Sequence, residues 1–190
     1  MKRLFWVRHG PTHARTMVGW SDLPADLSDS ARIARLSAFL PAAAPVVSSD
    51  LARAVQTADA IAGHRPRLPH DPGLREMHFG DWELKHHSEI EDQAHARRFW
   101  ESPGDIRPPG GESWHELTAR TDAAVRRVLD ENPAPDLIVV AHFGPILTQL
   151  QQALGLSADQ AFAHRIDNLS VTELHRTGNG WHAERINHMP

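Results

Sequence analysis

Two short apolar runs that each lead into a histidine constrain the fold of this chain most. Residues 4–7 (Leu-Phe-Trp-Val) run into Arg8-His9-Gly10, and residues 136–142, which contain Leu-Ile-Val-Val, end at His142. Runs of this length with aromatic and β-branched residues are typical of buried strands. Parallel strands carry the residues that follow them to one edge of a sheet, where open α/β sheets bind ligands. We therefore expect the two histidines to meet there.

The rest of the chain alternates between strand and helix patterns. Apolar spacing predicts four helices in the first two thirds of the chain and one after the second histidine, over residues 29–40, 51–62, 89–101, 112–132 and 146–154. Short strands are predicted over 45–50 and 67–70, and strands over 170–174 and 181–186 flank the hairpin turn Thr177-Gly178-Asn179-Gly180. Strand followed by helix, twice, is the βαβ pattern of a parallel sheet.

These patterns predict an α/β fold in one domain that spans residues 1–190. We expect a three-layer α/β/α sandwich whose central sheet is mostly parallel and has an antiparallel edge strand. Residues 71–111 are rich in glycine, proline and aromatic residues, and they predict an insertion that lies as a lid over one end of the sheet. Segments this long and irregular within a compact domain usually serve function.

Composition narrows the classes of function. The net charge of −4 provides no overall positive field, so neither nucleic acid nor membrane is expected as a partner. Because the chain has no cysteine, disulfide and thiol chemistry are excluded. The apolar run after Arg3 is too short for a signal peptide and no later run approaches a membrane span, so a cytoplasmic location is expected. The oligomeric state stays open, a homodimer included.

A third strand end adds a second arginine to the predicted site. The strand over 45–50 ends in Ser48-Ser49-Asp50, and Arg53 follows in the first turn of the next helix, where backbone amides also favour anions. Two histidines and two arginines at one edge of a negatively charged protein suit a small anion, above all phosphate. The 14 histidines show no ligand spacing such as HExxH, so no metal site is predicted.

Five segments together resemble the histidine phosphatase superfamily, also called the phosphoglycerate mutase-like family, and in particular its short phosphatases such as α-ribazole phosphatases. In family order the segments are Arg8-His9-Gly10 with Thr12, Ser49-x-Leu51-x-Arg53-Ala54-x-Gln56-Thr57-Ala58, Leu74-Arg75-Glu76-Met77-His78-Phe79-Gly80-Asp81-Trp82-Glu83, Gly110-Gly111-Glu112-Ser113 and Val140-Ala141-His142-Phe143-Gly144-Pro145-Ile146. Each segment alone is a weak signal, whereas five in order with suitable spacing are a strong one.

The resemblance implies phosphoryl transfer through a phosphohistidine, with no metal and no cofactor. His9 would attack phosphorus with a neutral ring nitrogen. Arg8, Arg53 and a cationic His142 would hold the phosphoryl oxygens and offset charge in the transition state. Glu76 would protonate the leaving alcohol and later deprotonate the attacking water.

Two glutamates are candidates for the general acid, and a third is expected to have a structural role. An acid that works near neutral pH needs a raised pKa, which a lid that excludes water favours and a cationic pocket opposes. Glu83 lies close to Glu76 in the sequence and is the alternative acid. Glu112 opens the predicted long helix, so we expect it to cap that helix.

Residues near the expected position of the leaving group are candidates for substrate binding: Thr12, Arg15, Ser21 and Phe143. Arg15 stands where many family members carry an asparagine that touches substrate, and Phe143 replaces a small residue after the second histidine. An arginine and an aromatic ring at these positions suit an anionic or flat group.

The resemblance leaves several functions open. The leading one is a phosphomonoesterase that acts on a small phosphorylated metabolite, such as α-ribazole phosphate or a sugar phosphate. A cofactor-dependent phosphoglycerate mutase is the first alternative, and the insertions of the longer mutases are not expected in 190 residues. A phosphohistidine-protein phosphatase and a non-enzymatic binding module are the others. The presence of Glu76 counts against the former, and the complete set of catalytic candidates counts against the latter.

Overall fold

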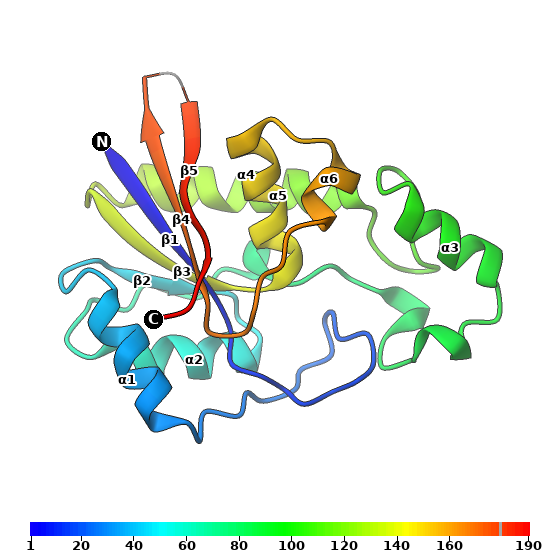
Figure 1. Ribbon diagram of the computed structural model, residues 1–190, viewed down its shortest axis with the longest axis horizontal. Helices are drawn as coiled ribbons and strands as arrows, with labels where there is room; N and C mark the ends of the chain where they lie inside the picture. Colours follow the sequence, from blue (N-terminus) through cyan, green and yellow to red (C-terminus); the bar gives the residue numbers. More distant parts are fainter. Residues whose placement is uncertain (179) are drawn as a thin grey trace.

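A five-stranded sheet with the order β2-β3-β1-β4-β5 forms the centre of the computed structural model, which describes residues 1–178 and 180–190 (Figure 1). The strands are β1 (Lys2–Arg8), β2 (Val46–Ser48), β3 (Asp136–Ala141), β4 (Val171–Thr177) and β5 (Gly180–His188). The first three are parallel, while β4 and β5 are antiparallel. Arg8 pairs with Ala141, and Ser48 with Val140, so the carboxyl ends of all three parallel strands lie at one edge.

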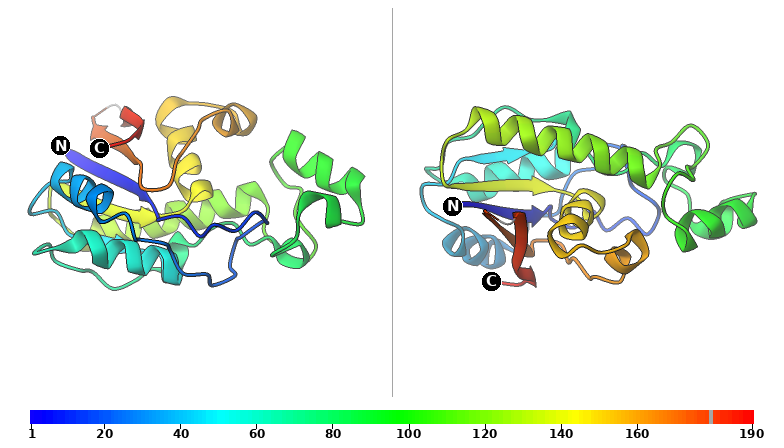
Figure 2. Two further views of the ribbon diagram at one scale, coloured as in Figure 1. Left: turned by 60° about the horizontal axis from the view of Figure 1, so that its bottom comes forward. Right: turned by 90° about the horizontal axis from the view of Figure 1, so that it is seen from above.

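Side chains alternate between two cores, as the two-residue period of a strand requires. Leu4 and Trp6 pack with α4 (Trp114–Glu131) and α5 (Phe143–Leu154) on one face. Phe5 and Val7 pack with α1 (Ser30–Phe39) and α2 (Ala52–Ala62) on the other (Figure 2). The short α6 (Ala158–Phe162) follows α5. The predicted three-layer sandwich is confirmed, with two antiparallel strands at the edge where one was expected.

Local sequence signals explain most helix boundaries. Asp29 caps α1, because its carboxylate accepts from the backbone N–H of Arg32 at 2.9 Å. Gly63 ends α2 with a positive φ of 54°, which glycine adopts without strain. Helix α5 begins at Phe143, three residues earlier than predicted, because Pro145 lies in the first turn, where no intrahelical N–H bond is lost.

The insertion over 71–111 extends beyond the carboxyl ends of β1 and β3, as both views in Figure 2 show. It contains the 3-10 turns η1 (Pro72–Leu74), η2 (Gly80–Trp82) and η3 (His87–Glu89) and the helix α3 (Gln93–Glu101). The predicted helix over 89–101 is therefore shorter, since Asp92 caps it and accepts from the N–H of His95 at 2.8 Å. The rings of Trp82 and Phe99 meet edge to face at 5.3 Å and fix α3 to the turn η2.

The strand predicted over residues 67–70 is not found. Only an isolated bridge joins Arg67 to Val46. The β4–β5 pair confirms the predicted antiparallel strands, although Asn179 of the predicted turn lies outside the described residues. Among the described residues, no helix has the length and apolar character needed to cross a membrane.

Candidate active site

The carboxyl edge of the parallel strands brings the two predicted histidines together. His9 directly follows β1, and its backbone N–H donates to the carbonyl of Ala141 at 3.1 Å. His142 follows β3, and the two imidazole rings lie 5.0 Å apart between centroids. Both side chains are buried, with relative exposures of 6% for His9 and 0% for His142. The meeting of the strand ends, predicted from the two apolar runs, is found.

The contacts of His9 define which ring nitrogen carries a lone pair. Its Nδ1 lies 2.6 Å from the carbonyl oxygen of Gly10, so Nδ1 carries the proton and donates it. Its Nε2 accepts from Nε of Arg53 at 3.3 Å, so Nε2 is the unprotonated nitrogen. Burial, followed by the charge of Arg53, lowers the pKa of His9 to about 3. His9 is therefore neutral at physiological pH, as a nitrogen nucleophile must be.

Arg53 is held on three sides inside the protein. Its guanidinium donates to the carbonyl of Ser21 at 2.9 Å and to that of Gly19 at 2.6 Å, and only 1% of the residue is exposed. The hydroxyl of Thr57 donates to the carbonyl of Arg53 at 2.7 Å and accepts from the N–H of Gly10 at 2.9 Å. Thr57 thus joins the first turn of α2 to the loop after β1, which fixes Arg53 against His9.

Arg8 and His142 carry polar atoms without partners at this edge. One guanidinium nitrogen of Arg8 donates to the carbonyl of Ile166 at 2.6 Å, and the guanidinium lies over the ring of Phe143 at 5.4 Å. The buried Nε of Arg8 and both ring nitrogens of His142 have no hydrogen-bond partner among the described residues. Buried polar groups of this kind are costly unless a ligand satisfies them, so the edge is built to receive hydrogen-bond acceptors.

The surroundings of His142 act against the cationic form that the family resemblance implies. Burial, followed by the nearby rings and guanidinium groups of His9, Arg53 and Arg8, lowers the pKa of His142 well below its usual value. This shift favours the neutral ring. Sequence reasoning placed the histidine at this edge but did not anticipate its complete burial.

Glu76 lies at the start of α5, beside His142. Its Oε1 accepts from the backbone N–H of Met77 at 2.9 Å and from that of Gly144 at 3.0 Å. A Cβ at position 144 would collide with the same oxygen, so glycine is required for this approach. Burial raises the pKa of Glu76, although the hydrogen bond from Met77 and the charges of Arg53 and Arg8 oppose the rise. The structure therefore gives this carboxyl the raised pKa that a general acid needs.

The carboxylate of Glu83, the alternative acid, accepts hydrogen bonds chiefly from the loop over residues 19–21. Its carboxylate accepts from the backbone N–H groups of residues 19, 20, 21 and 79 and from the hydroxyl of Ser21 at 2.6 Å. Burial acts to raise the pKa of Glu83, but the hydrogen bonds from Ser21, Trp20 and Gly19 outweigh it, so the pKa is lowered. A carboxylate that accepts five hydrogen bonds and stays ionised suits a structural anchor, and Glu76 is left as the favoured acid.

We expect the substitution Glu83→Gln to destabilise the fold by about 2 kcal/mol at neutral pH, because it removes hydrogen bonds to a charged acceptor. A carboxyl with a lowered folded-state pKa stabilises above its unfolded value of 4.5, and that stabilisation is lost as the pH falls through the folded value. The difference between wild type and variant in urea unfolding should therefore be large at pH 7 and shrink below about pH 4. Equal unfolding free energies at pH 7 would contradict this role.

The prediction that Glu112 caps the long helix is wrong. Ser113 is the cap of α4, where its hydroxyl accepts from the N–H of Glu116 at 3.2 Å and its own N–H donates to the Glu116 carboxylate at 2.8 Å. Glu112 instead accepts two hydrogen bonds of 2.8 Å from Arg120. Arg120 also donates to the carbonyl of Glu76 at 3.1 Å, so this ion pair supports the backbone that carries the acid.

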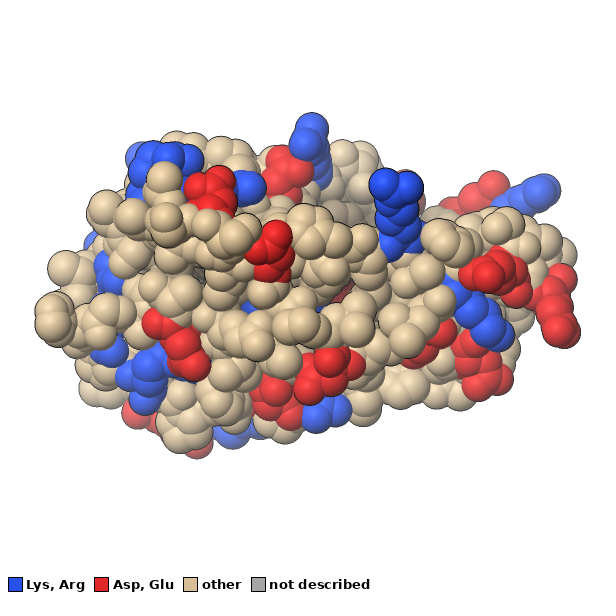
Figure 3. All heavy atoms as spheres, turned by 90° about the horizontal axis from the view of Figure 1, so that it is seen from below, with Lys and Arg blue, Asp and Glu red and all other residues tan. Residues whose placement is uncertain are grey.

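The structure separates the four candidates for substrate binding. Phe143 contacts Arg8 through its ring, and Ser21 contacts Arg53 through its carbonyl while its hydroxyl donates to Glu83. Thr12 is half-buried and accepts from the N–H of Ala14 at 3.4 Å, and Arg15 is exposed. On the face in Figure 3, basic and acidic side chains are interspersed. Arg53 of the site is buried, with 1% of the residue exposed.

Sequence reasoning missed two positioning residues. Asn168 donates through its side chain to the carbonyl of His9 at 2.8 Å, and Thr57 links the N–H of Gly10 to the carbonyl of Arg53. Thr57 belongs to the family segment that contains Arg53 and could have been found there. Asn168 lies in the loop before β4, far from any motif, and no pattern in the sequence points to it.

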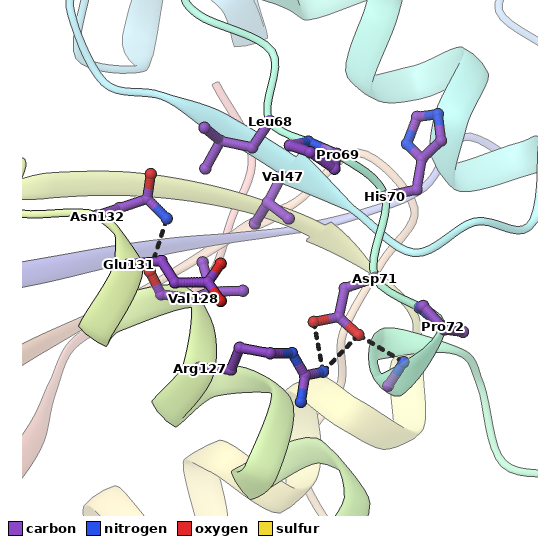
Figure 4. Close-up of a pocket in the computed structure, with 11 residues that line it drawn as sticks. Val47, Leu68, Pro69, His70, Asp71, Pro72, Arg127, Val128, Glu131 and Asn132 are labelled. Atoms are coloured by element: carbon purple, nitrogen blue, oxygen red, sulfur yellow. Dashed lines mark hydrogen bonds and ion pairs between the residues drawn. The ribbon is translucent and has the colours of Figure 1, made fainter.

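A second hollow lies away from these groups. A cavity of about 580 Å³ opens between the end of α4, the turn η1 and strand β2 (Figure 4), and none of the five catalytic candidates is among its described lining residues. Two of its charged side chains, Asp71 and Arg127, pair with one another at 2.6 Å. None of the buried side-chain atoms without a hydrogen-bond partner among the described residues belongs to its lining, unlike the carboxyl edge of the sheet.

The fold and the site together define the class of this protein: an α/β sandwich whose parallel strands deliver two histidines and two arginines to one edge. The family model of the histidine phosphatase superfamily (branch 1) matches residues 4–189. The chain belongs to this superfamily.

Individual relatives align with this chain over most of their length. An adenosylcobalamin/α-ribazole phosphatase of Escherichia coli is 27% identical over 87% of this chain and 85% of its own length. A glucosyl-3-phosphoglycerate phosphatase of Mycolicibacterium vanbaalenii is 34% identical over 84% and 77%, and a probable phosphoglycerate mutase of Proteus mirabilis is 31% identical over 95% and 88%. The solved structure of Bacillus stearothermophilus YhfR superposes with a TM-score of 0.90 at 28% identity, covering 100% of this chain and 98% of that one. The family and its named phosphatases place the chain among the phosphoric monoester hydrolases.

Proposed function

We propose that this protein is a metal-independent phosphomonoesterase that hydrolyses a small-molecule phosphate ester through a phosphohistidine on His9. The observation that carries the proposal is the neutral, buried His9, whose Nε2 lone pair faces Arg53 beside the unpartnered donors of Arg8 and His142. A nucleophile among oriented donors is what phosphoryl transfer requires, because that chemistry depends on positioning and on electrostatic stabilisation.

In the first step, the Nε2 lone pair of His9 forms a bond to phosphorus while the ester P–O bond breaks. Glu76, whose pKa is raised by burial, gives its proton to the departing alkoxide, so a neutral alcohol leaves. Arg8, Arg53 and His142 donate hydrogen bonds to the phosphoryl oxygens as charge develops on them.

In the second step, water attacks the phosphorus of the phosphohistidine. The Glu76 carboxylate takes a proton from that water, the P–N bond breaks, and its electron pair returns to Nε2. Inorganic phosphate leaves, and both His9 and Glu76 regain their starting states. No step needs a metal ion or a redox partner.

The substrate that we favour is α-ribazole phosphate or a sugar phosphate. The name of the Escherichia coli relative supports α-ribazole phosphate, and that of the Mycolicibacterium vanbaalenii relative supports a phosphate ester that carries a sugar. The half-buried Phe143, stacked on Arg8, lies beside the site where a flat or sugar-like leaving group would sit. The relative from Proteus mirabilis supports phosphoglycerate mutase as the second candidate; a mutase would transfer the same phosphoryl group back to an alcohol.

We expect a chelator to leave phosphate release unchanged within about twofold, because protein groups alone supply nucleophile, acid and anion-binding charges. The assay compares p-nitrophenyl phosphate, α-ribazole phosphate, sugar phosphates and 3-phosphoglycerate, each with and without EDTA. Loss of activity in EDTA, restored by a divalent metal, would contradict metal independence. Isomerisation of 3-phosphoglycerate that needs a bisphosphate primer, without hydrolysis of the other esters, would identify the mutase.

A further inference from the structure

Three side chains with metal-binding atoms gather on the β4–β5 hairpin. The ligand atoms of His175, His182 and Glu184 lie within 4.8 Å of one another. His175 and His182 are cross-strand partners, and their rings lie 5.4 Å apart. His175 pairs across β1 with Arg3, whereas the catalytic edge begins at Arg8, so the cluster is at the opposite end of the sheet from the active site.

A β-bulge places the third side chain. Leu174 pairs with Ala183 and Glu173 pairs with Arg185, so Glu184 is the extra residue on β5. Glu184 and Arg185 are consequently both exposed, whereas strict alternation would turn one of them toward the core. Bulges re-aim side chains in this way and are common beside functional sites.

A buried carboxylate orients His175. Glu173, only 3% exposed, accepts from Nε2 of His175 at 2.7 Å and from Arg185 at 2.7 Å. Nε2 therefore carries the ring proton, and Nδ1 keeps its lone pair. A carboxylate behind a histidine fixes the tautomer and orientation of many metal ligands. Arg185 is paired with Glu173, and Arg3 with Asp136 at 2.6 Å, so their charges are compensated.

We infer that this hairpin binds one divalent transition-metal ion, such as Zn²⁺, through His175, His182 and Glu184. Two imidazoles and one carboxylate are a ligand set of zinc, and water would complete the tetrahedron. Magnesium and calcium prefer oxygen ligands and are not expected there. Since the ligands come from both strands and the site is remote from His9, the ion would clamp β5 to β4 and take no part in catalysis.

Calorimetric titration with Zn²⁺ alone tests this inference. We expect one zinc per wild-type chain. The affinity for zinc should be at least about tenfold weaker in His182→Ala and in Glu184→Gln, because a loss of about 10- to 100-fold follows even when a residue that only supports a ligand is changed. His64→Ala is the matched control, because His64 is exposed and outside the cluster. X-ray absorption of the zinc complex should show nitrogen ligands at about 2.0–2.1 Å.

Thermal unfolding separates loss of binding from loss of folding. Because His182 and Glu184 are exposed, both variants should melt near the wild-type temperature without zinc. Zinc should then raise the melting temperature of the wild type and of His64→Ala more than that of either cluster variant. Wild-type affinity in both cluster variants, no binding by the wild type, or one zinc shared by two chains would each overturn the inference. Hydrolysis assays do not enter this test, so its outcome is independent of the proposed function.

Discussion

Replacing His9 with alanine is expected to reduce phosphate release by about 10⁴-fold or more, because the variant has no nitrogen to form the covalent intermediate. Inorganic phosphate should still bind, since Arg8, Arg53 and His142 remain. The measurements are the steady-state rate on the best ester of the panel and the affinity for phosphate, with His64→Ala as a control histidine.

The covalent intermediate gives this prediction a direct readout. An alkaline quench of the wild type during turnover should trap a phosphoryl group on the peptide that contains His9, since phosphohistidine survives base better than acid. Turnover by His9→Ala at the wild-type rate, or a phosphoryl group trapped on another residue, would refute the assignment. Loss of phosphate binding together with activity would instead indicate a disrupted site, which a melting curve would reveal.

Replacing Glu76 with glutamine should lower turnover of alkyl phosphates by about 10²- to 10⁴-fold, because the leaving alkoxide loses its proton donor. The burst of nitrophenolate released from p-nitrophenyl phosphate in the first turnover should be much less affected, since nitrophenolate leaves without protonation, whereas hydrolysis of the phosphohistidine should be slowed for both esters. An equal loss in the first turnover of both esters would show that Glu76 positions other groups and does not act as an acid. The comparison of two leaving groups separates chemistry from structure in a single variant.

The pH dependence of the same variant provides a second readout. The acid must be protonated, so wild-type activity on alkyl phosphates should fall as the pH rises through the raised pKa of Glu76, and this limb should be missing in Glu76→Gln. A carboxyl with a raised folded-state pKa stabilises below its unfolded value of 4.5, and that contribution is lost as the pH rises through the folded value. Glutamine should therefore not weaken the fold at neutral pH. If the fall in activity with rising pH persists in Glu76→Gln, the titrating group is another residue.

The sequence predicted the parts of this fold that depend on local pattern and burial. The strands that precede His9 and follow residue 136 were found because fully buried strands have continuous apolar runs. The boundary of α4 was misplaced by two residues, although Ser113 and Glu116 form a recognisable capping box. Glu112 was mistaken for the cap because nothing in the sequence shows that Arg120, two turns along the helix, takes its carboxylate.

The parts that could not be predicted depend on register and on three-dimensional burial. The histidine–glutamate cluster escaped the search for ligand spacing because a bulge between two strands, and not a sequence interval, brings it together. The lowered pKa of His142 could not be predicted, because the complete burial that causes it follows from α5 and its neighbours. The choice between Glu76 and Glu83 required the positions of backbone N–H groups, which give Glu83 five donors.

A chain of hydrogen bonds connects Glu83 to Arg53. Glu83 belongs to the insertion and holds the loop over residues 19–21, and two carbonyls of that loop hold the guanidinium of Arg53. The guanidinium of Arg53 is therefore positioned by a carboxylate that does not touch it, through the loop that lies between them. The insertion thus contributes to the anion-binding site through this loop as well as through Glu76.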